Sequence, residues 1–264
     1  MTDRRHASAH LMLINPERVF YAGLLGRPRR RETGAFQIYV CVEGALTIAC
    51  GGRVQTGLSM AAVEPYVEHT IESEHPTILC VTIEPETVSR EALAALSARI
   101  AARPEEIVGR IRAAHRALIA EPCSEGLDRQ AFDTLFFGAP LPPRALDARI
   151  ARALARLENF SGPPASAAEC AAQARLSPSR FLHLFKQETG FSFRALRAYK
   201  RARHVLHFAN RDINFAHLAQ DIGYPDSTHF SHSIRRFYGL KPSAIFDGSR
   251  DLAIYPRAPA LASA

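Results

Sequence analysis

The chain has 264 residues, which is enough for one large domain or two ordinary ones. Its formal net charge is +7, and it contains neither a run of about 18 apolar residues nor the apolar core of a signal peptide. We therefore expect no transmembrane helix and no secretory leader, and the five widely spaced cysteines favour reduced thiols over a disulfide framework.

The first part of the chain has the pattern of a β domain. Residues 1–18 are polar, and we expect them to be loosely held. Beyond them, short apolar segments alternate with turn signals such as Glu43-Gly44, Gly51-Gly52 and Gly57. Strands are expected at 19–25, 36–42, 45–50, 60–63, 67–72 and 77–83. So many short strands close together predict a small antiparallel barrel or sandwich.

The order of these strands and turns resembles that of the small cupin-like sensor domains found in front of many regulators. The residues that carry this resemblance are Gly44, Gly57, Pro65 and His69. It implies that residues 1–84 form a small β-barrel sensor domain for a small-molecule effector. The candidate effector-binding residues are Tyr39, Cys41 and His69.

His69 is also the residue to weigh as a metal ligand. A metal-bearing cupin enzyme would show a His-x-His pair with a nearby carboxylate, and that pair is absent here. His69 stands alone among Glu64, Glu68 and Glu72, which favours a polar residue at the mouth of the barrel over an effector contact or a metal ligand. The cysteines of the predicted strands are best explained as small buried hydrophobes, because no basic neighbour or second cysteine marks a reactive thiolate.

The run Arg27-Pro28-Arg29-Arg30-Arg31 lies between two predicted strands. A solvated loop is the favoured interpretation. The alternatives are an extra contact to phosphate or a site for an acidic effector.

Residues 85–137 have a helical pattern, with apolar stripes that include Leu96, Ile100, Ile107 and Ile111. Such helices must bury their apolar stripe against the barrel or against a partner chain, and their position predicts dimerisation helices. The prolines of Gly138-Ala139-Pro140-Leu141-Pro142-Pro143 then interrupt any helix, so we place a linker at 138–145. An amphipathic helix is expected at 148–159.

The rest of the chain contains one pattern written twice, at 168–192 and 215–243. In the first copy, Ser166 with Glu169 fits a capping box, Ser177-Pro178 fits a helix start and Gly190 fits a helix end. In the second copy, Asp226 and Gly239 bound the corresponding helix. Each copy therefore predicts two helices joined by a tight turn, which is the helix-turn-helix plan for binding the DNA major groove.

The connector between the two copies, residues 192–210, is expected to be helical. Its 19 residues would span about 28 Å at 1.5 Å per residue, close to the roughly 34 Å repeat of B-DNA. Its basic residues, which include Lys200, Arg201 and Arg203, either contact phosphate or are solvated. The charge distribution agrees with DNA binding, because residues 145–264 carry 17 Lys and Arg against 9 Asp and Glu, while residues 1–144 carry 16 against 17.

Residues 146–247 resemble the DNA-binding domain of AraC/XylS-family transcription regulators. The resemblance covers both copies: SPSRFLHLFKQETG from Ser177, and AQDIGYPDSTHFS from Ala219 with the later FYGLKPS from Phe237. Two positions depart from the family pattern. Arg175 stands in the first turn where the family often has glycine, and Ile234 stands where phenylalanine is common.

The resemblance and the helical periodicity together predict the DNA contacts. Base-contacting residues are expected to be Ser179, Leu182, His183, Ser227, Thr228 and His232. Phosphate contacts are expected from Arg180, Lys186, Arg235 and Arg236. His229 and His232 have a spacing that could chelate a metal, but no third ligand lies nearby in the sequence.

These observations predict two domains: an N-terminal, mainly β half (a small cupin-like barrel) followed by helices at 85–137, and an all-α half with two helix-turn-helix units and a connector helix. Residues 248–264 are expected to be a flexible tail. The family resemblance implies a cytoplasmic, nucleoid-associated activator that is a homodimer and binds promoter DNA, RNA polymerase and an effector. No catalytic residue, metal or cofactor is expected. The alternatives are a cupin-type metalloenzyme fused to a DNA-binding domain and an effector-independent dimeric regulator.

Overall fold

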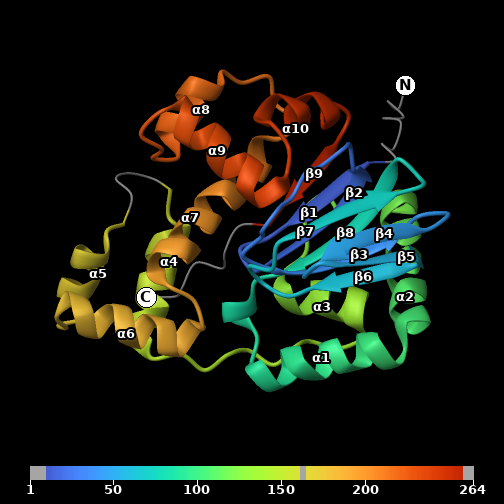
Figure 1. Ribbon diagram of the computed structural model, residues 1–264. Helices are drawn as coiled ribbons and strands as arrows, with labels where there is room; N and C mark the ends of the chain where they lie inside the picture. Colours follow the sequence, from blue (N-terminus) through green and yellow to red (C-terminus); the bar gives the residue numbers. More distant parts are fainter. Residues whose placement is uncertain (1–9, 161–164, 258–264) are drawn as a thin grey trace.

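The computed structural model describes residues 10–160 and 165–257 of the chain. Its N-terminal half is built on two β-sheets (Figure 1). The larger sheet has the strand order β6-β3-β8-β2-β1-β9 and the smaller one the order β5-β4-β7. The strands of the two sheets are β1 (Leu11–Ile14), β2 (Arg18–Leu24), β3 (Phe36–Cys41), β4 (Leu46–Cys50), β5 (Arg53–Leu58), β6 (Met60–Val63), β7 (His69–Ser73), β8 (Thr77–Ile83) and β9 (Ala253–Pro256).

The larger sheet is buried on both faces, which makes this half a three-layer structure. One face packs on the smaller sheet through a core that includes Tyr39, Leu46, Ile71 and Ile78. The other face is covered by α1 (Arg90–Ala102), α2 (Pro104–Ala120) and α3 (Arg129–Phe137); in Figure 1, α1 and α3 lie below the sheet and α2 at its right-hand side. The helices at 85–137 therefore bury their apolar stripes against the sheet of their own chain.

The C-terminal half is all-α with a single core. It contains α4 (Ala148–Glu158), α5 (Ala167–Gln173), α6 (Pro178–Thr189), α7 (Phe193–His204), the 3-10 helix η2 (Val205–Phe208), α8 (Phe215–Asp221), α9 (Ser227–Tyr238) and α10 (Pro242–Gly248). The pairs α5–α6 and α8–α9 are the two helix-turn-helix units. This arrangement confirms the predicted order of a mainly β half, which is a two-sheet sandwich, and an all-α half.

The residues predicted to cap the helices form the expected hydrogen bonds. The side chain of Ser166 accepts from the backbone of Glu169, whose carboxylate accepts in return from the backbone of Ser166. Asp226 caps α9 by accepting from two backbone N–H groups. Gly190 and Gly239 end α6 and α9 in the left-handed conformation, with φ of 88° and 70°.

Three strands were not expected from the sequence. Leu11–Ile14 was assigned to a loosely held segment, yet it forms β1 between β2 and β9. Arg53–Leu58 forms β5, an exposed edge strand without apolar alternation. The predicted flexible tail is wrong for Ala253–Pro256, which forms β9 (parallel to β1), so the C-terminal end of the described chain completes the N-terminal sheet. Residues 258–264 lie outside the described residues.

The connector is a shorter α-helix than predicted. α7 has 12 residues, about 18 Å, and the four residues of η2 add about 8 Å at the 2.0 Å rise of a 3-10 helix. The total length of about 26 Å is close to the roughly 28 Å expected from the sequence, because the 3-10 helix tightens the last turn of the connector without reversing the chain.

Candidate nucleic-acid interface

The outward faces of α6 and α9 carry all ten residues predicted to contact DNA. In α6 the apolar residues Phe181 and Phe185 are fully buried, and Leu182 is 42 % exposed although it is apolar. In α9 the buried stripe is Phe230, Ile234 and Phe237. The remaining faces are exposed at Ser179, Arg180, Leu182, His183, Lys186, Ser227, Thr228, His232, Arg235 and Arg236.

Both recognition helices pack on α7, which therefore joins the two units. The ring of Phe193 lies 5.2 Å from that of Phe185 in α6, edge to face. The ring of Tyr199 lies 5.5 Å from that of Phe237 in α9, and Tyr238 Oη donates a hydrogen bond to Ala202 O at 3.2 Å. Such aromatic contacts fix orientation as well as burying area.

The tight turns of the two units have the same backbone geometry. Arg175 has a φ of 54° and Gly223 a φ of 77°. After each of them, the next N–H closes the turn: Leu176 N donates to Ala171 O at 3.0 Å, and Tyr224 N donates to Ala219 O at 2.8 Å. Arg175 thus adopts the left-handed conformation that glycine adopts in the second unit.

Two basic residues of α7 are removed from any DNA contact because they are buried against the N-terminal half. Lys200 Nζ lies 2.8 Å from Glu84 and 2.6 Å from Glu86, and 3.1 Å from Glu158 of α4. Arg203 Nε lies 2.7 Å from Glu84, and its Nη2 donates to backbone carbonyls of the N-terminal half. The prediction that the basic residues of the connector contact phosphate or are solvated is therefore wrong for Lys200 and Arg203.

The charges of this cluster oppose the effect of burial on Glu84 and Lys200. Burial by itself raises the pKa of a carboxyl, but Lys200 and Arg203 outweigh burial and hold the pKa of Glu84 below its ordinary value. For Glu86 burial prevails, and its pKa is raised. Burial would lower the pKa of Lys200, yet Glu84, Glu86 and Glu158 raise it above its ordinary value. The cluster is therefore an ionic contact between the two halves.

Of the candidate effector residues, the structure brings two together. Tyr39 Oη lies 3.0 Å from His69 Nε2, between the two sheets, and Tyr39 also donates to Gln37. Burial lowers the pKa of His69 to about 4, so its imidazole is neutral. The sulfur of Cys41 contacts neither Tyr39 nor His69 by a hydrogen bond and instead donates to Gly44 O and Ser59 O.

A residue that the sequence assigned to a solvated loop joins this pair. The guanidinium carbon of Arg31 lies 4.8 Å from the centre of the Tyr39 ring, and the Arg31 backbone pairs with that of His69. Arg31 Nε and Nη2 are buried and have no hydrogen-bond partner. In contrast, Arg27, Arg29 and Arg30 are exposed, as the solvated-loop interpretation expects.

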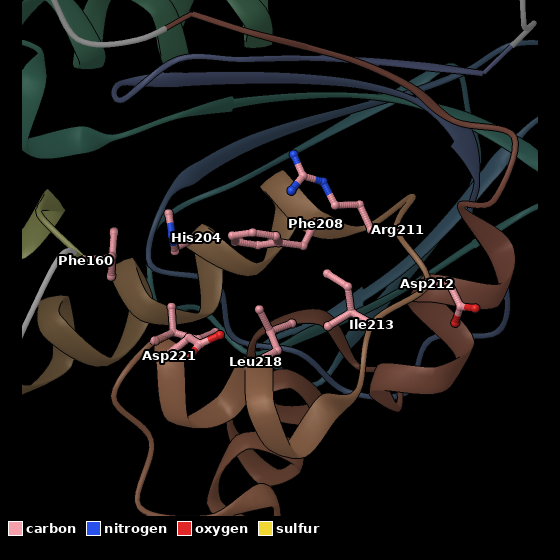
Figure 2. A pocket seen from close by; sticks show the side chains of 9 residues that line it. Phe160, His204, Phe208, Arg211, Asp212, Ile213, Leu218 and Asp221 are labelled. Carbon is pink, nitrogen blue, oxygen red and sulfur yellow. The ribbon is translucent and has the colours of Figure 1, made fainter.

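Two cavities lie beside α7 and η2. One, of about 370 Å³, lies between η2 and α8; in Figure 2, His204 and Phe208 line one side and Leu218 and Asp221 the other. The second, of about 420 Å³, lies between the two halves and includes Pro16, Lys200 and His204 in its lining. Burial and the charge of Arg203 lower the pKa of His204 to about 4, so this histidine contributes a neutral imidazole to both cavities.

Among residues 10–160 and 165–257, no three His, Cys, Asp or Glu side chains are grouped so that they could hold a metal ion. His229, which the sequence paired with His232, instead contacts the capping carboxylate of Asp226 at 2.8 Å. None of the described helices is both long and apolar enough to span a bilayer.

Comparison with known proteins supports the arrangement of the C-terminal half. The model of a helix-turn-helix domain family matches residues 170–247. No curated protein matched the chain in sequence. Among solved structures, ToxT from Vibrio cholerae O395 is similar at a TM-score of 0.56 and 10 % identity, over 88 % of this chain and 97 % of ToxT.

Two further similarities were found. A ToxT structure with bound (E)-4-(8-methylnaphthalen-1-yl)but-3-enoic acid has a TM-score of 0.54 and 11 % identity, over 88 % of this chain and 98 % of that one. The DNA-binding domain of AdpA in complex with a target DNA has a TM-score of 0.37 and 19 % identity, over 39 % of this chain and 95 % of that domain. The ToxT structures share the two-domain fold with this chain.

Proposed function

We propose that the protein is an AraC-type transcription regulator that binds a specific promoter sequence in two adjacent major grooves, a proposal supported by the match of residues 170–247 to the model of a helix-turn-helix domain family. The observation that carries the proposal is the pair of exposed polar faces on α6 and α9, both mounted on α7. Helices of this kind place their N-terminal residues against base edges.

The experiment is a selection of bound sequences from a random pool of duplex DNA by the full-length protein. We expect two short motifs to be enriched, separated by about one helical turn of roughly 34 Å. The matched control is a variant with His183→Ala and His232→Ala, which should lose enrichment of both motifs. If the protein enriches no sequence over the starting pool, the proposal fails.

We propose that the N-terminal half responds to an effector that carries a carboxylate. The buried, unpartnered Nε and Nη2 of Arg31 support this, because a guanidinium fork matches a carboxylate and an unsatisfied buried donor is costly. The carboxylic acid bound in a ToxT structure belongs to the same chemical class. Thermal denaturation with octanoate and benzoate, and with octanamide and benzamide as neutral controls, tests it. Stabilisation by an acid that Arg31→Gln abolishes would support the proposal, and equal effects of acids and amides would refute it.

We further propose that the protein acts in the cytoplasm as a homodimeric activator that contacts RNA polymerase, and that it is not an enzyme. The exposed alanines of α1, which include Ala94, Ala95 and Ala98, are a surface that a second copy can cover. Sedimentation at increasing concentration tests the dimer, with Ala95→Glu as the disrupting variant. A promoter fused to a reporter gene distinguishes activation from repression.

A further inference from the structure

The C-terminal end of the recognition helix α6 is bound by arginines from outside the helix-turn-helix units. Arg90 Nη2 donates to Gln187 O at 2.7 Å, and Arg144 Nη1 donates to Glu188 O at 3.1 Å and to Thr189 O at 2.9 Å. The last carbonyls of a helix have no partner within the helix, and positive charge is favourable beside them. These arginines therefore supply the partners that α6 lacks.

The C-terminal end of the other recognition helix, α9, is bound by backbone N–H groups of the loop at 29–32. Arg29 N donates to Gly239 O and Glu32 N donates to Arg236 O, both at 2.9 Å. The carboxylate of Glu32 pairs with Arg236 at 3.1 Å. A Cβ built at Gly239 would lie 2.5 Å from Arg29 O, which shows how closely the loop fits this helix end.

The groups that bind the two helix ends belong to one body. Arg90 begins α1, and the loop at 29–32 joins β2 to β3. Arg144 lies in the linker, but the linker is attached to the N-terminal half: Arg144 Nε donates to Val88 O at 3.1 Å, and Ser89 N donates to Pro142 O at 2.9 Å. The sandwich and its helices thus contact both recognition helices at the same end.

We infer that the N-terminal half positions α6 and α9 relative to each other and so determines which spacing between the two half-sites the protein accepts. Arg90, Arg144 and Glu32 are the positioning residues. Each base pair added between the half-sites moves the second one by roughly 3.4 Å and rotates it by roughly 35°. Packing on α7 already orients the two helices, and the contacts at their C-terminal ends narrow the range of half-site spacings that they accept. This inference rests on the proposed function.

The test measures the affinity of the full-length protein for the selected DNA site and for sites lengthened or shortened by one and two base pairs. For the unchanged protein we expect one base pair to weaken binding about tenfold, since the loss of one charge-assisted hydrogen bond to DNA has an effect of that order. In Arg144→Gln and Glu32→Gln this penalty should shrink to about threefold or less. The affinity for an isolated half-site should be unchanged in Arg144→Gln, whereas Glu32→Gln frees Arg236 for phosphate and should raise it. Arg53→Gln and Glu125→Gln remove exposed charges elsewhere and should keep the full penalty.

The outcomes separate the inference from the proposed function. If no DNA sequence is selected at all, the proposed function fails. If a site is selected but the two variants have the spacing profile of the unchanged protein, the positioning role is refuted. It is also refuted if the variants bind every spacing more tightly by one common factor. That result would mean that the contacts reduce the access of DNA to the helices and do not set the distance between them.

Discussion

Lys200 Nζ lies 2.8 Å from Glu84 Oε2, and the two side chains are 2 % and 0 % exposed although they come from opposite halves of the molecule. A buried ammonium needs carboxylate partners, because taking a charge out of water costs several kcal/mol. Glu86, at 2.6 Å, supplies a second partner. The contact between the halves is therefore part of the folded structure and holds the connector α7 against the sandwich.

Replacing only one member of this cluster should be strongly destabilising. We expect Lys200→Met to lower the free energy of unfolding by about 3–5 kcal/mol, because it leaves Glu86 buried without a cation and Glu84 with Arg203 alone. Urea denaturation measures the loss. Arg194→Met, at an exposed position of the same helix, should change stability by less than about 0.5 kcal/mol. Equal effects of the two substitutions would show that the buried charges do not depend on Lys200.

The turn of the first helix-turn-helix unit should be improved by the residue that the second unit has. Arg175 adopts a φ of 54°, which costs a non-glycine residue about 1–2 kcal/mol, while glycine loses about 0.5–1 kcal/mol more chain entropy on folding. Arg175→Gly should therefore raise the free energy of unfolding by up to about 1 kcal/mol. Arg175→Ala keeps the strain and should give no gain. A loss of stability in the glycine variant would mean that the Arg175 side chain makes a contact worth more than the strain.

Stability should fall in mild acid because of buried neutral histidines. Burial lowers the pKa of His69 to about 4, whereas an unfolded histidine has a pKa of about 6.5. Between these values the unfolded chain binds the proton and the folded chain does not, so stability falls as the pH drops from about 6.5 towards 4. Urea denaturation at pH 7, 6 and 5 should show this slope, and His69→Gln should make it shallower. His217→Gln, at an exposed position, should leave it unchanged.

The sequence predicted the DNA-binding half better than the sensor half because the determining signals are local there. Capping residues, helix-ending glycines and a 3.6-residue apolar stripe specify α6 and α9 without reference to the rest of the chain. β9 has no such signal, because Ala253–Pro256 becomes a strand only where β1 offers its edge. Lys200 and Arg203 look like any solvated basic residues until Glu84, more than 100 positions away, is folded against them. Long-range charge pairing of this kind leaves no periodic trace in a single sequence.

On the exposed faces of α6 and α9, substitutions of the histidines should change sequence preference, whereas substitutions of the arginines should change the affinity for all sequences. His183→Ala or His232→Ala should change base preference within one half-site only, because each histidine lies on a single recognition helix. Arg235→Ala should weaken binding to all sequences and lower the salt slope by about one. Titrations of the selected DNA and of scrambled DNA at several salt concentrations measure both effects.

Arg236 differs from Arg235 in having a carboxylate partner, so the salt slopes of the two alanine variants can be compared. It neighbours Arg235 and is also exposed, but Glu32 pairs with it at 3.1 Å. If that pair persists on DNA, Arg236→Ala should change the salt slope less than Arg235→Ala does, because a paired arginine displaces fewer counterions. The same reduction for both arginines would show that DNA binding breaks the contact with Glu32. An unchanged slope for Arg235→Ala, together with unchanged base preference in both histidine variants, would place the DNA on another face of the domain.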